Sequence, residues 1–344
     1  MTTHTIDLAT RDGERVSFPC DEAESVVAAA AKANLTLPGH CRQGGCGACR
    51  ATADDGDYHL AEHSASALPA EAAAAREVLL CRTFPRGTLS ITAPFDRSHI
   101  LSGPVTERQA EIVERTLVGG RTVRLLLSLV PDEDNGNAAE FEAGQYMELE
   151  IPGTGVRRAY SLSNTANWLG HLEFLIRLQP DGRFSRWLEH DARPGQILSV
   201  RGPQGGFTLQ ERGLRPRWFV AGGTGLAPML SMLRRMAEWQ EPQEARLYFG
   251  VSLEAELFAL DELERLKAEL PKLTVVPCVW KPGAGWTGFA GTPVDALRRD
   301  LADATTTPDL YLCGPPALID AAEAAARDHG VPADHLFSER FLPS

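Results

Sequence analysis

The sequence predicts three domains of different classes: a small α+β domain, an antiparallel β-barrel and a doubly wound α/β domain with a parallel sheet. Four cysteines spaced as metal ligands and a glycine-rich loop lie in the first part of the chain. Short strands broken by glycine and proline follow from Val105 to about Gly213, and apolar strands then alternate with helices from Pro216 onward. A chain of 344 residues is long enough for these domains, which we expect at 1–97, 104–213 and 214–344.

The composition excludes several functional classes. Hydrophobic residues make up 43% and charged residues 23% of the chain, as in ordinary globular proteins. Lys and Arg number 34 against 46 Asp and Glu, and the resulting net charge of −12 disfavours nucleic acid and anionic membranes as partners. The chain contains no apolar run of the ~18 residues that a membrane span requires. The amino terminus also lacks a leader pattern, so we expect a cytoplasmic protein.

The first domain begins with a predicted hairpin, in which His4–Ala9 and Arg15–Phe18 flank a turn at Asp12-Gly13. Three further elements and a linker follow: a helix over Val26–Ala33, a second helix over Ala70–Val78, a strand over Thr88–Thr92 and a linker over Asp96–Pro104.

The second domain is predicted from its short strands: Arg121–Val130, Gln145–Ile151, Arg158–Ser161, Leu172–Leu178 and Gln196–Arg201, with one helix over Ser185–Glu189. The third domain alternates strands and helices: Trp218–Ala221, Pro228–Trp239, Arg246–Val251, Asp261–Leu270, Leu273–Val279, Pro293–Leu301, Leu310–Cys313 and Ala317–Asp328. Such a sheet binds its ligand at the carboxyl ends of the strands.

The cysteine spacing in the first domain indicates an iron–sulfur site. Cys41-x4-Cys46-x2-Cys49, followed far downstream by Cys81, matches the plant-type [2Fe-2S] pattern. A structural zinc site is the alternative, but zinc ligands usually come in two close pairs. A Rieske centre would need two histidine ligands, and His40 stands alone beside four suitable cysteines. Glycines in the loop allow backbone N–H groups to point at the sulfurs.

Two motifs in the second domain suit a nucleotide-like ligand. Arg158 and Tyr160 lie on one side of their strand and Ser161 on the other. A guanidinium suits a diphosphate and a phenol ring can cover one face of a flavin, although an ordinary strand would read the same way. The turn Gly182-Arg183-Phe184-Ser185 opens a short helix whose free N–H groups suit a second phosphate.

The third domain carries a phosphate cradle and a second conspicuous strand end. Strand Trp218–Ala221 leads into Gly222-Gly223-Thr224-Gly225 before a helix, although this is not the G-x-G-x-x-G fingerprint. Cys313-Gly314-Pro315 ends another strand of the same sheet, where a nicotinamide ring would lie. The alternative for Cys313 is a small buried residue that packs the strand end.

Together these residues resemble the iron–sulfur flavoprotein reductases of bacterial aromatic-ring dioxygenases, and most of all the reductases of benzoate and anthranilate 1,2-dioxygenases. The resemblance covers nearly the whole chain and implies a β-grasp ferredoxin domain, an FAD barrel and an NAD domain. It implies that Arg158 holds the FAD diphosphate, that Tyr160 stacks on the isoalloxazine and that Ser161 lies near flavin N5. The ending Phe337-Ser338-Glu339-Arg340-Phe341 also resembles the family, which would place Phe341 near the other flavin face.

These features predict an NADH-dependent oxidoreductase that supplies a terminal oxygenase. A flavin is needed because NADH releases two electrons as hydride whereas a [2Fe-2S] cluster accepts one. Glu254 follows a strand where a carboxylate can bind the adenosine ribose and repel a 2′-phosphate, so NADH is expected over NADPH; the alternative is that Glu254 only starts a helix. Two alternative functions are the reductase of a soluble di-iron monooxygenase and a non-catalytic redox sensor.

Overall fold

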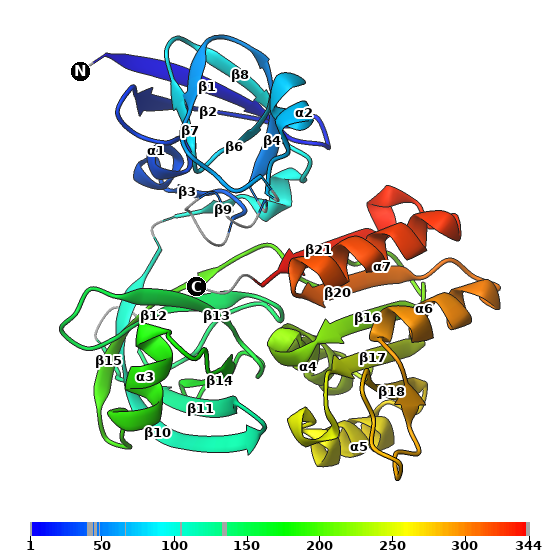
Figure 1. The fold of residues 1–344 in the computed structure, drawn as a ribbon. Helices are drawn as coiled ribbons and strands as arrows, with labels where there is room; N and C mark the ends of the chain where they lie inside the picture. Colours follow the sequence, from blue (N-terminus) through cyan, green and yellow to red (C-terminus); the bar gives the residue numbers. More distant parts are fainter. Residues whose placement is uncertain are drawn as a thin grey trace. The chain divides into compact units, whose positions relative to one another are not determined.

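A computed structural model describes residues 2–39, 44, 47, 49–65, 67–103, 105–132 and 136–341 of the chain. It divides into two compact units (Figure 1). The first consists of 1–106 with the short segment 202–206, and the second of 107–201 with 207–344. The second unit contains both the barrel and the α/β domain, so each of the two units is described by itself below.

The first unit has the β-grasp arrangement of a mixed sheet around one helix. Its sheet has the order β2-β1-β8-β4-β6. The strands are β1 (Thr3–Ala9), β2 (Arg15–Asp21), β4 (Arg50–Asp55), β6 (Glu77–Leu79) and β8 (Leu89–Thr92). Helix α1 (Val26–Lys32) begins at Ser25, whose hydroxyl accepts the Ala28 N–H. Its apolar face is buried with Ile6, Leu8 and Ile91, and this burial holds the unit together.

Two predictions for this unit need correction. The predicted helix over Ala70–Val78 is shorter: α2 ends at Ala74 (Ala70–Ala74), and the chain then enters β6. Arg76 has a φ of 63°, which is incompatible with a right-handed helix. The Val78 side chain is fully buried. The predicted linker over Asp96–Pro104 contains η1 (Arg97–His99) and β9 (Leu101–Ser102), and β9 pairs with β3 (Leu35–Thr36). A second small sheet pairs β5 (Tyr58–Leu60) with β7 (Thr83–Pro85).

Segment 202–206 belongs to the first unit although it includes the end of a barrel strand, β15 (Ile197–Gln204). The Gly202 N–H donates to the Thr106 carbonyl at 3.0 Å. A Cβ at Gly206 would lie 2.7 Å from Cδ2 of His99, so only glycine fits here without displacing that ring.

The barrel in the second unit has the strand order β13-β12-β15-β10-β11-β14. Its strands are β10 (Glu107–Gly119), β11 (Thr122–Leu129), β12 (Tyr146–Glu150), β13 (Arg157–Ser161), β14 (His171–Arg177) and β15 (Ile197–Gln204). Leu162 and Phe174 form a bridge between the two outer strands of this order. Helix α3 (Arg183–His190) packs Phe184, Trp187 and Leu188 into the barrel core. The predicted strands are present; β10 was not predicted.

The α/β domain is a parallel sheet with the order β19-β18-β17-β16-β20-β21. Its strands are β16 (Arg217–Gly222), β17 (Ala245–Val251), β18 (Leu273–Val279), β19 (Phe289–Ala290), β20 (Asp309–Gly314) and β21 (Leu336–Arg340). Strands β19 and β21 were not predicted.

Helices cover both faces of this sheet. Phe219 and Ala221 pack with α4 (Leu226–Glu238) and α5 (Leu260–Glu269), whereas Trp218 and Val220 pack with α6 (Pro293–Ala302) and α7 (Pro316–Asp328). Both faces of each central strand are therefore buried, which explains their continuous apolar sequences. The order along the sheet reverses between β16 and β20, and such a switch point forms a ligand crevice at the carboxyl edge.

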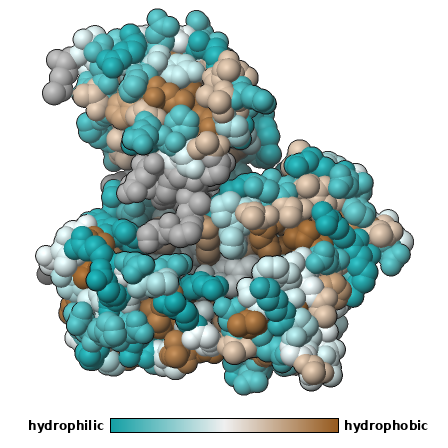
Figure 2. All heavy atoms as spheres, viewed as in Figure 1, coloured by the Kyte–Doolittle hydropathy of each residue, from teal (hydrophilic) through white to brown (hydrophobic). Residues whose placement is uncertain are grey.

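Within the described part of the chain, no helix is long and apolar enough to cross a membrane. On the face shown in Figure 2, hydrophilic residues dominate and apolar residues form small separate patches.

Candidate functional site

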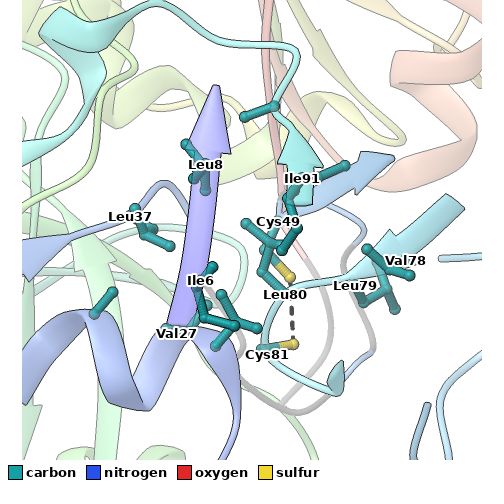
Figure 3. Close-up of a cluster of buried hydrophobic side chains, with 14 of the residues drawn as sticks. Ile6, Leu8, Val27, Leu37, Cys49, Val78, Leu79, Leu80, Cys81 and Ile91 are labelled. Atoms are coloured by element: carbon teal, nitrogen blue, oxygen red, sulfur yellow. Dashed lines mark hydrogen bonds between the residues drawn. The ribbon is translucent and has the colours of Figure 1, made fainter. Parts of the chain in front are cut away.

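Two of the four predicted metal ligands meet in the core of the first unit. Cys49 directly precedes β4 and Cys81 lies just after β6, and their sulfur atoms face each other at 3.3 Å (Figure 3). Both side chains are buried. This separation is far longer than the ~2.05 Å of a disulfide bond. Cys41 and Cys46 lie outside the described residues, and the described part of the chain contains no group of three candidate metal ligands.

Gly44 and Gly47 of the cysteine loop are at positions that suit only glycine. Gly44 and Gly47 both have a φ of 75°, which glycine adopts without strain. A Cβ at Gly44 would lie 2.7 Å from Cγ of Arg82, and one at Gly47 would lie 3.2 Å from the Ala67 carbonyl oxygen. The two adjacent thiols and the close packing around Gly44 and Gly47 fit the predicted cluster, whose ligands would be Cys49, Cys81 and the two cysteines of the loop.

The flavin-type motif lies on β13. The Tyr160 ring is half-buried and packs on Phe184 of α3, with 5.1 Å between ring centroids. Burial raises the pKa of the Tyr160 phenol, so this side chain is neutral at physiological pH. Arg158 is also half-buried, and its guanidinium donates to the Arg157 carbonyl at 2.8 Å. The strand thus has a neutral ring and a cation on one side. The ring suits a flavin and the cation suits a diphosphate.

The turn at Gly182 is closed by its own side chains. The Ser185 hydroxyl is buried and accepts the Gln179 N–H at 2.8 Å. Gly182 is the amino-terminal cap of α3, and Arg183, its first residue, is exposed. Ser185 therefore shapes the turn, while Arg183 is exposed to solvent.

The two glycine motifs of the α/β domain touch each other at the carboxyl edge of the sheet. Ala221 on β16 is opposite Cys313 on β20. A Cβ at Gly225 would lie 2.2 Å from the Cys313 carbonyl oxygen, and one at Gly222 would lie 3.1 Å from Cδ of Pro315. Thr224 is part of η2 (Gly223–Gly225), which leads into α4. Two motifs that are distant along the chain therefore meet at the switch point of the sheet, where such folds form their ligand crevice.

A buried carboxylate that sequence reasoning missed joins this crevice to the barrel. The Glu339 side chain is 2% exposed, and its Oε2 accepts a hydrogen bond from Ser161 at 2.9 Å. The Cys313 thiol donates to the same oxygen at 3.8 Å. Burial, followed by the charge of Glu339, raises the pKa of Cys313 well above its ordinary value, so the thiol keeps its proton. Phe341 is close by, because its N–H donates to the Gly314 carbonyl at 2.8 Å.

A second missed residue, Arg177 at the end of β14, brings positive charge to the cradle. Its Nη1 lies 3.6 Å from the position that a Cβ at Gly223 would take. Its Nη2 contacts Glu256 at 3.2 Å. An arginine that ends a strand gives no sequence signal of this kind, because the contact depends on how the barrel and the sheet meet.

Glu254 lies in η3 (Glu254–Glu256), just after β17, and its side chain is exposed. Its Oε1 accepts the Gly283 N–H at 2.7 Å. The chain just after β18 runs beside this position, because the backbone N–H of Lys281 donates to the Ser252 carbonyl at 3.0 Å. The Lys281 ammonium lies over the Trp280 ring, 4.4 Å from its centroid.

Comparisons with known proteins agree with this geometry. Three family models match in succession: a 2Fe-2S iron–sulfur cluster binding domain over 9–86, an oxidoreductase FAD-binding domain over 109–209 and an oxidoreductase NAD-binding domain over 219–324. Methane monooxygenase component C of Methylosinus trichosporium is 39% identical over 87% of each chain. The anthranilate 1,2-dioxygenase electron transfer component of Acinetobacter baylyi is 31% identical over 99% of this chain and 98% of its own.

The chain belongs to the iron–sulfur flavoprotein reductase family. A solved structure of an Amycolatopsis cytochrome P450 reductase superposes with a TM-score of 0.79 at 28% identity, covering 98% of this chain and 99% of that one. The predicted fold class, the oxidoreductase activity and the three cofactors NAD, FAD and [2Fe-2S] are thus confirmed. The resemblance to dioxygenase reductases is confirmed as well, and monooxygenase reductases are relatives of the same kind.

Proposed function

We propose that this reductase takes hydride from NADH at the crevice beside Ser161 and supplies electrons to the terminal oxygenase of a benzoate- or anthranilate-type 1,2-dioxygenase. The contact between Ser161 and Glu339 is the observation that carries the proposal, because it joins the flavin strand to the nucleotide sheet next to Cys313. We assign the cluster to 1–97, the flavin to 104–213 and NADH to 214–344, and we place the chain in the cytoplasm, where NADH is abundant.

FAD, when bound, would supply the conversion between the two-electron chemistry of NADH and the one-electron chemistry of the cluster. Arg158 would neutralise the diphosphate of FAD, and Tyr160 and Phe341 would hold its ring. The backbone of Gly222–Gly225 cradles the NADH diphosphate at the start of α4, and Arg177 adds a cation there. The Ser161 hydroxyl donates its hydrogen bond to Glu339, so its oxygen remains available as an acceptor. Cys313 is buried in the core at the end of β20, so its neutral thiol adds no charge beside the site.

Glu254 is proposed to select NADH. Its carboxylate is held by the Gly283 N–H at 2.7 Å, and there it can accept hydrogen bonds from the ribose hydroxyls and repel a 2′-phosphate. Lys281, which the sequence places far from Glu254, lies on the neighbouring strand end. Its position above Trp280 supplies a competing cation, so the preference for NADH is expected to be finite.

A di-iron monooxygenase is the second candidate partner. Its specific support is the 39% identity to the methane monooxygenase component, which exceeds the 31% identity to the anthranilate dioxygenase component. The hydride site of this reductase would serve either class of oxygenase. The two classes are expected to differ in the surface that they offer to the reductase.

The test is reconstitution. The purified chain, loaded with FAD and cluster, is mixed with NADH and either a benzoate-type dioxygenase or a di-iron hydroxylase, and product is measured per NADH consumed. Coupled product formation with the dioxygenase alone supports the proposal, and coupling with the hydroxylase alone identifies the second candidate. Slow turnover with every acceptor, ferricyanide included, would indicate a redox sensor instead.

A further inference from the structure

A chain of charged side chains, buried at its centre, connects the barrel to the α/β domain. At its centre is Glu173 of β14, whose side chain is 5% exposed. Its Oε2 accepts from Nε of Arg124 at 2.7 Å, and its Oε1 accepts from Nη1 of Arg234 at 2.9 Å and from the Ser163 hydroxyl at 2.8 Å. Arg234 also donates through Nε to Glu262 of α5 at 2.5 Å.

Arg234 also holds the backbone that follows the flavin strand. Its Nη1 donates to the Ser163 carbonyl at 2.8 Å, two residues beyond Ser161. One turn earlier on α4, the Ser231 hydroxyl donates to the Asn164 carbonyl at 2.6 Å. Helix α4 begins directly after Gly225. One helix therefore starts at the nucleotide cradle and is hydrogen-bonded to the exit of β13.

These contacts set a geometry in a way that apolar packing does not. Apolar side chains of similar size can replace a buried ion pair without loss of stability, so the pair is not required for folding as such. A guanidinium has its donors in a fixed plane, and here one group reaches Glu173, Ser163 and Glu262 at once. A small rotation of one domain on the other would break several of these bonds together.

We propose that Arg234 and Glu173 are positioning residues that fix β13 relative to the nucleotide cradle and thereby set the rate of hydride transfer. This inference rests on the proposed function, because it requires flavin on β13 and NADH at the crevice. Hydride transfer is sensitive to such placement: a displacement of ~1 Å can lower a rate about a hundredfold. The two residues act through the strand and the helix and do not themselves touch the reacting atoms.

The test uses the holoenzyme and two variants. Arg234→Lys keeps the charge but loses the planar fork, and the double variant Arg234→Met with Glu173→Met replaces the buried pair by apolar side chains. Arg235→Lys is the matched control, because Arg235 is the next residue on α4 and instead contacts Glu241 and Trp239. Flavin reduction by NADH and by 4-deuterated NADH is followed by stopped flow, together with NAD⁺ affinity, FAD content and melting temperature.

We expect both variants to retain FAD and to bind NAD⁺ within about twofold of the wild type, and to reduce flavin about tenfold more slowly with a larger deuterium isotope effect. The long-wavelength absorbance of nicotinamide stacked on flavin should weaken, and amide exchange at Ser163 and Asn164 should accelerate. The control should match the wild type in every measurement.

The inference would be overturned if the folded double variant reduced flavin at the wild-type rate and kept the wild-type long-wavelength absorbance. Arg234 and Glu173 would then have a structural role only. If the double variant does not fold, Arg234→Lys decides by the same criteria, since it removes no charge from the buried pair. Failure of the wild type itself to oxidise NADH would instead refute the proposed function, so the two failures are distinguishable.

Discussion

The Ser161 hydroxyl donates a hydrogen bond of 2.9 Å to the Glu339 carboxylate, although 178 positions separate the two residues in the chain. Ser161 ends β13 of the barrel, and Glu339 is opposite Cys313 in the parallel pairing of β21 with β20. A single buried carboxylate thus links the two halves of the proposed hydride site.

Replacing Glu339 by Ala should therefore slow hydride transfer more than it weakens cofactor binding. The Ser161 hydroxyl loses its acceptor and is free to turn into the site, and we expect flavin reduction by NADH to fall about tenfold to a hundredfold. Stopped-flow absorbance of the flavin measures this rate. Glu323→Ala is a suitable control. Glu323 lies on α7 and pairs with Arg340, which follows Glu339 on β21. An unchanged rate in Glu339→Ala would remove this carboxylate from the site.

Loss of the cluster should separate two activities. Cys81→Ser removes one predicted ligand, so the variant should lack iron and should not support oxygenase turnover. It should still pass electrons from NADH to ferricyanide, because the flavin and nucleotide sites lie in the other structural unit. Iron content, both activities and far-ultraviolet circular dichroism are measured together. Cys46→Ser should give the same pattern.

Cys20→Ser is the control for the cluster ligands. Cys20 is buried in the same unit, and burial raises the pKa of its thiol to about 12, so it is no candidate for a thiolate ligand. This variant should keep its iron. If a folded Cys81→Ser protein still drove the oxygenase at the full rate, the flavin would be the direct donor.

The Tyr160 ring should matter for flavin retention rather than through its hydroxyl. Tyr160→Ala removes the ring that packs on Phe184, so FAD affinity and both activities should fall together. Tyr160→Phe keeps the ring and should retain FAD within about threefold of the wild-type affinity. Fluorescence titration of the apoprotein with FAD measures both. Equal losses in the two variants would assign the effect to the phenol oxygen.

Charge reversal at Glu254 should change the nucleotide preference. Glu254→Arg replaces the ribose acceptor by a cation, and the ratio of kcat/KM for NADH over NADPH should fall at least about tenfold, equivalent to ~1.4 kcal/mol. Lys281→Ala should act in the opposite direction by removing the neighbouring cation. Steady-state kinetics with both nucleotides decide, and an unchanged ratio in Glu254→Arg would show that another residue reads the ribose.

The stability of the second unit should depend on pH through Glu173. Burial alone would raise the pKa of this carboxyl, but Arg234, Ser163 and Arg124 outweigh burial and lower it. A carboxyl with a lowered pKa in the folded state stabilises the fold above its unfolded pKa of about 4.3, and the contribution disappears as the pH falls through the folded value. Urea unfolding followed by flavin fluorescence between pH 7 and pH 3 should therefore be less pH-dependent in Glu173→Gln than in the wild type. Equal pH profiles would contradict the assignment, and exposed Glu189→Gln is the control.

Local sequence patterns were sufficient for most of the regular elements. The strands of the α/β domain are continuous apolar runs because both of their faces are buried, and such runs are conspicuous. Strand β10 escaped prediction because exposed polar residues interrupt it on its outward face and it carries a bulge after Ile112. The false extension of α2 came from an alanine-rich stretch whose helical propensity is overridden at Arg76 and Val78 by sheet pairing.

The site was predictable where a motif is local and not where it depends on tertiary contacts. Gly222–Gly225 and Cys313 were predicted as site residues because glycines and a strand end mark them, and they stay predictions. Glu339 and Arg177 were missed, since a glutamate in a short strand near the end of the chain and an arginine at a strand end are ordinary until the fold brings them to the crevice. Arg234 also gave no sequence signal, because its partners come from β14, from the turn after β13 and from α5.

The discontinuity of the first unit restricts how such reductases can be recombined. Gly206 fits against His99 only because it lacks a side chain, and Gly202 bonds to Thr106, yet both glycines are encoded far downstream of the segment that they touch. A chimaera that exchanges only residues 1–106 between two relatives would place a foreign surface on these glycines. Transfer of the iron–sulfur module to a new flavoprotein therefore requires the short downstream segment to be transferred with it, and a gene fusion at a single junction will not suffice.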